Sequence, residues 1–190
     1  MSATDGLILS LKDGQKGTAP EAEDHVRRLI RDLQKRSPAA INYFARQLAT
    51  CTTLPKGAVL CTLPPRQLGS TASGVRQMAL RLCELGEWLD GTHCLTRTRA
   101  FDERAGEYPE ASLIRQLTTL AVRDPELIQD RQVVLLTDIS RSGRTLRAGE
   151  MLLLRAGASA VAKCCLATEP LPNAMPSWAR EQAQRIGEGH

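Results

Sequence analysis

The segment VVLLTDISRSGRT, residues 133–145, joins four apolar residues to a polar turn that contains a glycine. The apolar run predicts a buried strand, because strands covered on both faces of a parallel sheet read as continuous apolar runs. Apolar residues at helical spacing then predict a helix over 145–156, which Gly157 ends. A strand, a loop and a helix in this order form the repeating unit of α/β proteins.

The same alternation extends on both sides of this segment. We expect strands at 58–63, 93–96, 117–122 and 159–167, and a helix at 75–85 that Gly86 closes. Residues 97–112 are charged and contain glycine, which indicates a loop. The fold class predicted for residues 57–168 is therefore α/β, with a mainly parallel sheet flanked by helices.

The N-terminal part of the chain has a different pattern. Residues 1–17 are polar apart from one apolar island at 7–9 and predict an arm or a short strand. Helical spacing predicts helices at 20–35 and 38–50. We therefore divide the chain into an N-terminal arm and helical addition (1–56), a core (57–168) and a C-terminal tail with one short helix (169–190).

Composition narrows the classes of function. Of the 25 Lys and Arg residues only five are Lys, and the Arg guanidinium matches phosphate or carboxylate geometry. No run of five basic residues exists, and aromatic residues make up 3% of the chain, which is unlike most nucleic-acid-binding proteins. The net charge of +4 is a mild excess.

The six cysteines include no C-x-x-C pair and have no clustered histidine. Buried reduced thiols are therefore expected rather than a zinc site, and no metal held directly by the protein is predicted. The N-terminus has no apolar signal region and no segment approaches transmembrane length, so the expected location is the cytoplasm, with no membrane contact.

The turn after residue 136 has the chemistry of a phosphate site. A helix N-terminus offers free N–H groups and partial positive charge, and Gly143 lets an anion approach the backbone. The Asp138 carboxylate suits sugar hydroxyls or a metal rather than phosphate. Neither G-x-x-x-x-G-K-[ST] nor G-x-G-x-x-G is present, and an ordinary capped turn is the alternative. The candidate phosphate-binding residues are Arg141, Ser142, Gly143, Arg144 and Thr145.

The turn resembles the loop that binds phosphoribosyl pyrophosphate (PRPP) in type I phosphoribosyltransferases. That family has two acids, two variable residues, Thr-Thr-Gly, a variable residue and Thr after an apolar strand. Asp138 matches the second acid, Ser142 the second Thr, and Gly143 and Thr145 their counterparts. Residues 62–66 and 74–77 further resemble the ComF-like subgroup, and the resemblance covers about 57–168.

This resemblance implies an enzyme that transfers ribose 5-phosphate from PRPP to an unknown acceptor, with magnesium accompanying PRPP. It implies Asp138 as the catalytic residue that holds the ribose hydroxyls. It also implies pyrophosphate or lid roles for three basic residues, Arg66, Arg97 and Arg99, for which plain exposed arginines are the alternative. The expected partner is a small phosphorylated sugar or a nucleotide.

Two departures leave other functions open. Thr137 stands where the family has its first acid, and Arg141 stands where it has its first Thr. The alternatives are a regulatory module that senses PRPP or a nucleotide without turnover, and an accessory protein for nucleic-acid handling. A homodimer and an unknown protein or nucleic-acid partner also stay open.

Overall fold

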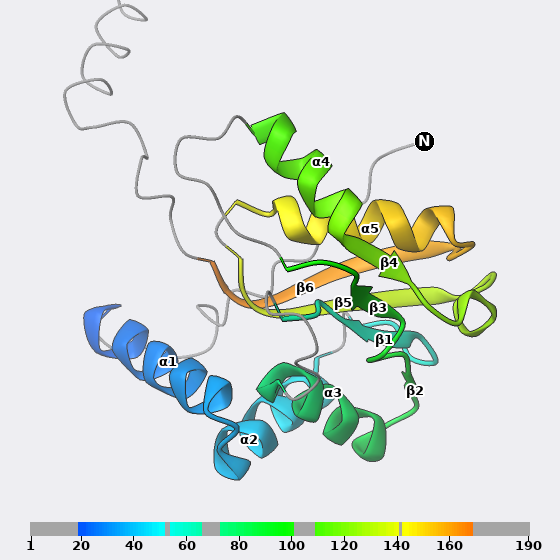
Figure 1. Cartoon of the computed structure of the whole chain (residues 1–190). Helices are drawn as coiled ribbons and strands as arrows, with labels where there is room; N and C mark the ends of the chain where they lie inside the picture. Colours follow the sequence, from blue (N-terminus) through cyan, green and yellow to red (C-terminus); the bar gives the residue numbers. More distant parts are fainter. Residues whose placement is uncertain (1–18, 52–53, 66–72, 101–108, 141, 169–190) are drawn as a thin grey trace, which may run out of the picture.

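The computed structural model describes residues 19–51, 54–65, 73–100, 109–140 and 142–168. Its centre is a four-stranded sheet in the order β2-β1-β5-β6, in which every neighbouring pair is parallel. The strands are β1 (Val59–Thr62), β2 (Leu89–Asp90), β5 (Gln132–Ser140) and β6 (Ala160–Thr168). Helices flank the sheet, so the predicted fold class is confirmed (Figure 1).

The apolar run in β5 is buried because both faces of the sheet are covered. Successive side chains of a strand point to opposite faces. Val134 and Leu136 join the core on the side of α1 (Ala19–Gln34), α2 (Pro38–Ala49) and α3 (Gly74–Leu85). Val133 and Leu135 join a second core with α5 (Arg144–Arg155) (Figure 1).

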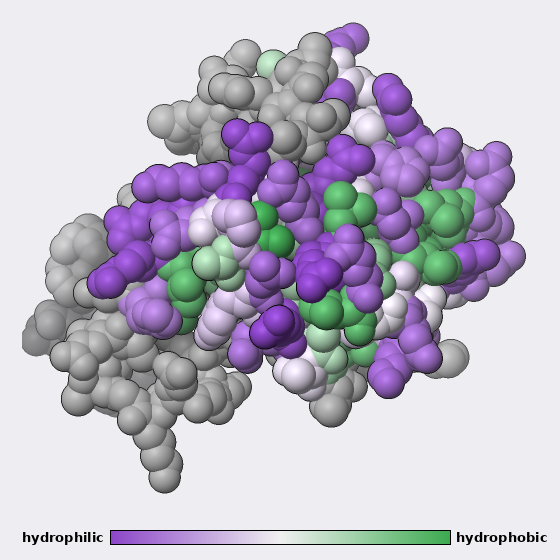
Figure 2. Space-filling model, turned by 90° about the horizontal axis from the view of Figure 1, so that it is seen from below, coloured by the Kyte–Doolittle hydropathy of each residue, from purple (hydrophilic) through white to green (hydrophobic). Residues whose placement is uncertain are grey.

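The two N-terminal helices were predicted with nearly correct bounds, and they share a core with the sheet. Leu33 of α1 and Phe44 of α2 are fully buried in the same cluster as Leu60 and Leu136. A Cβ atom on Gly74 would lie 1.8 Å from the Leu33 carbonyl oxygen, so α1 lies directly against the start of α3. Seen from the side of these helices, most of the surface is hydrophilic, and the hydrophobic residues form small separate patches (Figure 2).

The segment between β2 and β5 corrects three sequence predictions. The strand expected at 93–96 is β3 (Leu95–Arg97), which does not join the main sheet but pairs antiparallel with β4 (Leu120–Val122). Residues expected as the end of a loop and the start of a strand form α4 (Pro109–Thr119). A short 3-10 helix, η2 (Pro125–Leu127), follows β4. The two-residue strand β2 was not predicted.

Two predicted helix ends differ in their backbone. Gly157 follows α5 with φ +104°, a left-handed conformation that favours glycine. Gly86 follows α3 with an extended backbone, φ −154°, so it does not close the helix as a left-handed residue. Glycine is required at this position because a Cβ atom would lie 2.1 Å from the ring of Trp88, whose indole N–H donates to the Pro55 carbonyl.

All six cysteines lie in the described residues, and none of them forms a disulfide. Four are buried, whereas Cys51 and Cys83 are half-buried. Within the described ranges, no helix combines the length and hydrophobicity needed to cross a bilayer.

Candidate functional site

A cavity of about 390 Å³ opens at the carboxyl ends of β1 and β5. This is the edge of a parallel sheet where ligands bind, because the loops and helix N-termini that follow the strands meet there. Its lining comes from α1, the loop after β1, the start of α3, β3, α4, the end of β5 and the start of α5. The described lining residues are Gln34, Leu63, Pro64, Pro65, Ser73, Val75, Arg97, Ser112, Gln116, Thr137, Asp138, Ile139, Ser140, Ser142, Gly143, Arg144, Thr145 and Leu146.

The turn into α5 has the geometry of an anion site. Gly143 is the N-cap residue with φ +69°, and among the described residues no side chain caps the helix there. A Cβ atom on Gly143 would meet no atom within 4 Å, so the glycine faces open space. The first N–H groups of a helix lack acceptors within the helix and carry its partial positive charge. Ser142 and Thr145, which both carry hydroxyl groups, line the same cavity.

Asp138 lies within β5 rather than in the loop that was predicted, since the strand continues to Ser140. Its Oδ1 accepts the backbone N–H of Ile139 at 2.8 Å and lies 3.4 Å from the Thr137 hydroxyl. Its Oδ2 accepts from Nε2 of Gln34 at 2.8 Å. The carboxylate is therefore held in a fixed orientation at the cavity wall, with the last residue of α1 against it.

Arg97 lines the cavity but is held by neighbouring groups of the protein. Its guanidinium donates to the Pro65 carbonyl, the Thr119 hydroxyl and Oε1 of Gln116, at 3.0, 2.9 and 3.2 Å. Gln116 in turn donates from Nε2 to the Thr145 hydroxyl at 3.0 Å. A chain of hydrogen bonds thus joins β3, α4 and the first turn of α5.

The structure brings six of the predicted site residues together at one cavity: Arg97, Asp138, Ser142, Gly143, Arg144 and Thr145. Arg99 is exposed and does not belong to the described lining. Arg66 and Arg141 lie outside the described residues. The roles of all these residues stay predictions.

Sequence reasoning missed Gln34 and Gln116. Gln34 is the last residue of α1, in a region treated as an addition to the core. Gln116 belongs to α4, together with Ser112 and Thr119. These three polar side chains are buried and recur at helical spacing, i, i+4 and i+7. That spacing was the signal for a helix with a polar buried face.

The charges at the cavity suit an anion beside a single carboxylate. Arg144 lines the cavity, and within the described ranges no ion pair involves it. Asp138 is the carboxylate of the described lining, and the described residues contain no cluster of three His, Cys, Asp or Glu side chains. Magnesium is usually held by one or two carboxylates plus substrate phosphates. This donor set fits a magnesium ion bound largely by its substrate.

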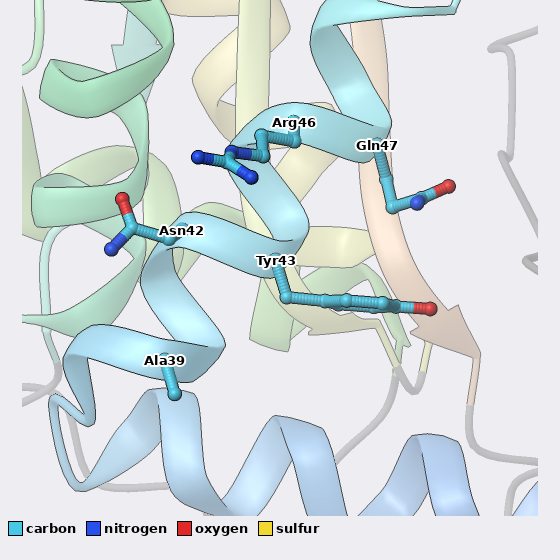
Figure 3. A pocket seen from close by; sticks show the side chains of 5 residues that line it. All are labelled: Ala39, Asn42, Tyr43, Arg46 and Gln47. Carbon is cyan, nitrogen blue, oxygen red and sulfur yellow. The ribbon is translucent and has the colours of Figure 1, made fainter.

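A second hollow, of about 400 Å³, lies on α2 and lacks these features. Ala39, Asn42, Tyr43, Arg46 and Gln47 line it, all from one helix (Figure 3). Asn42 and Arg46 point to one side and Tyr43 and Gln47 to the other, so the polar groups do not converge (Figure 3). Asn42 also accepts a hydrogen bond from Arg81 of α3 at 3.1 Å.

Comparison with known proteins gives matches at the level of structure. No protein-family model matches the sequence, and no curated protein matches it. An allosteric regulatory enzyme of purine biosynthesis has a TM-score of 0.48 and 20% identity, over 77% of this chain and 32% of that one. The chain thus spans about a third of that enzyme.

Two hypoxanthine phosphoribosyltransferases are also similar. The one from Staphylococcus aureus has a TM-score of 0.40 and 15% identity, over 76% of this chain and 66% of that one. The one from Trypanosoma cruzi has a TM-score of 0.42 and 12% identity, over 77% and 70%. Because every one of these TM-scores is below 0.5, the function has to be argued from the site residues themselves.

Proposed function

We propose that this chain is a phosphoribosyltransferase-like protein that binds PRPP and transfers its ribose 5-phosphate to an acceptor. The observation that carries the proposal is the left-handed Gly143 at the uncapped start of α5, which faces an open cavity that Asp138 also lines. Backbone N–H groups at a helix N-terminus bind phosphate, and a carboxylate nearby binds sugar hydroxyls. The cavity therefore offers complementary groups for both halves of a sugar phosphate.

The 5-phosphate would lie at the first turn of α5, against Ser142, Gly143 and Thr145, with Arg144 adding positive charge. Asp138 would accept hydrogen bonds from the ribose hydroxyls. In the transfer, the bond between ribose C1 and the pyrophosphate oxygen breaks, and pyrophosphate leaves with the electron pair. The acceptor then forms the new bond to C1.

The protein's contribution to this reaction is positioning and electrostatic stabilisation. Holding the phosphate and the hydroxyls at once fixes C1 relative to the acceptor, and fixed donors stabilise charge that develops as pyrophosphate leaves. Magnesium bound with PRPP would neutralise part of the pyrophosphate charge. Arg66 and Arg99 remain candidates for pyrophosphate contact, and the ComF-like subgroup remains the proposed relationship.

A second candidate is a sensor that binds PRPP or a nucleotide without turnover. Two observations favour it. Thr137 is buried, with 8% of its surface exposed, where the resembled family has its first acid. The remaining carboxylate already accepts a hydrogen bond from Gln34, so one of its acceptor sites is occupied by the protein itself.

Pyrophosphate release separates the two candidates. The wild type and Thr137→Asp are incubated with PRPP, magnesium and a panel of nucleobases and amines, and pyrophosphate is measured. For an enzyme, we expect release by the wild type, and faster release by Thr137→Asp because the second carboxylate is restored. Binding of PRPP by both proteins without pyrophosphate release would favour the sensor.

A further inference from the structure

The hydrogen bonds of Arg97 determine how the side chain of Gln116 is oriented. A guanidinium can only donate hydrogen bonds, so the Gln116 atom that faces Arg97 must be the amide oxygen. The amide nitrogen then faces the Thr145 hydroxyl, 3.0 Å away. Gln116 has 3% of its surface exposed, so its amide has no solvent in which to find other partners.

This orientation determines what the Thr145 hydroxyl can do. The nitrogen of Gln116 donates, so the Thr145 oxygen must accept, and the single hydroxyl hydrogen is directed elsewhere. In the part of the chain that the structure describes, no acceptor takes that hydrogen. Thr145 is the second residue of α5 and lines the cavity, so the hydrogen is available to a ligand there.

We propose that Gln116 is a positioning residue that keeps the Thr145 hydroxyl a hydrogen-bond donor toward the phosphate of the ligand. Arg97 acts through Gln116 and does not itself contact pyrophosphate. This inference rests on the proposed function, because it specifies how that same site recognises its phosphate. Hydrogen bonds in a chain polarise one another, so the positive charge of Arg97 strengthens the final donor without occupying the cavity.

The test uses Gln116→Glu, which keeps the length and shape of the side chain. The carboxylate still accepts from Arg97, but its second oxygen faces Thr145 and takes the hydroxyl hydrogen for itself. Affinity for ribose 5-phosphate, measured by calorimetry, should fall roughly ten- to hundredfold, since a hydrogen bond to a charged group is lost. Thermal unfolding of the variant should stay close to that of the wild type.

The added negative charge of Gln116→Glu would also weaken anion binding, and a double-mutant cycle separates the two effects. In the Thr145→Val background, residue 145 has no hydroxyl. There, Gln116→Glu should reduce the affinity for ribose 5-phosphate by less than about threefold. In the Thr145→Ser background, which restores a hydroxyl, the full loss should return. The same loss in all three backgrounds would overturn the inference, because it would then come from charge or structure alone.

If Gln116→Glu does not fold, Gln116→Met replaces it in the test, because Met removes both amide contacts without adding charge. A loss of affinity that occurs with Thr145 and disappears in the Thr145→Val background supports the inference. A loss that is unchanged in that background, or no loss at all, contradicts it. A wild type that does not bind ribose 5-phosphate at millimolar concentration would instead overturn the proposed function, and this inference with it.

Discussion

Asp138 is the residue on which the sugar half of the proposed site depends. Its carboxylate accepts from Ile139 and Gln34, and the residue lines the cavity beside the turn into α5. Asp138→Asn keeps the shape but removes the charge. PRPP affinity should then fall roughly ten- to hundredfold, because a hydrogen bond to a charged acceptor contributes about 1.5–3 kcal/mol. Calorimetric titration measures this directly.

Asp130→Asn is the matched control for that change. Asp130 is exposed and lies just before β5, whereas Asp138 lies near the other end of the same strand. Both substitutions alter net charge equally. Equal losses of affinity in the two variants would indicate a general effect of charge and would argue against a specific ribose contact.

At the residue scale, the sequence was informative wherever the physical reason was local. The buried strand, Gly143 and the hydroxyls around it could be predicted, because a continuous apolar run and a glycine before a helix each have a local cause. Gln34 and Gln116 could not be assigned to the site, because each reaches it through a tertiary contact with an element distant in sequence.

At the scale of elements, the contact between α1 and α3 positions Gln34 against the cavity. A Cβ atom at Gly74 would lie 1.8 Å from the Leu33 carbonyl oxygen and 2.7 Å from its carbon, both backbone atoms. Gly74→Ala therefore has to push the two helices apart. We expect it to lower the free energy of unfolding by about 1–3 kcal/mol, the usual cost of overpacking.

Urea unfolding, followed by circular dichroism, measures this loss. Gln34→Ala is the control, because it removes the contact with Asp138 without moving α1. That variant should change stability by less than about 0.5 kcal/mol, as expected for an exposed side chain. A Gly74→Ala protein with the urea midpoint of the wild type would show that the helices do not pack this closely.

The elements that were predicted wrongly have separate causes. The first residues of α4 follow a charged stretch, so residues 97–112 were interpreted as a loop, although Pro109 suits the first position of a helix. β3 and β4 are three residues each, too short for a period of two to be distinguished. Their pairing in a separate sheet depends on how α4 folds back, which no local pattern encodes.

At the scale of the whole molecule, one buried and one half-buried thiol couple stability to pH. Burial raises the pKa of Cys164 from 9.0 to about 12, and burial also raises the pKa of Cys83 to about 11. The folded state therefore keeps protons that the unfolded chain loses above pH 9. This stabilisation is complete below pH 9 and is lost as pH rises toward the pKa of the folded protein.

We expect Cys164 alone to remove about 1 kcal/mol of stability between pH 8 and pH 10, at 1.36 kcal/mol per pKa unit. Urea unfolding at the two pH values measures the change. Cys164→Ala should be less stable at pH 8 because a buried atom is lost, but it should lose less stability on going to pH 10. Equal pH dependence in the two proteins would show that this thiol is not protected.

The central claim concerns the whole site, a cavity built from six parts of the chain around the start of α5. Gly143→Val and Gly57→Val form a matched pair for testing it. Both glycines have positive φ, +69° and +74°, and a Cβ atom on either would meet nothing within 4 Å. Both variants should therefore have similar backbone strain, about 1–3 kcal/mol. Only Gly143 faces the cavity.

Calorimetric titration of PRPP, with and without magnesium, into the wild type and this pair tests the claim most directly. The account predicts that the wild type and Gly57→Val bind with similar affinity, and that Gly143→Val loses binding because its side chain fills the position of the phosphate. A Gly143→Val protein that binds as tightly as the wild type would contradict the account. So would a wild type that binds neither PRPP nor any nucleotide at millimolar concentration.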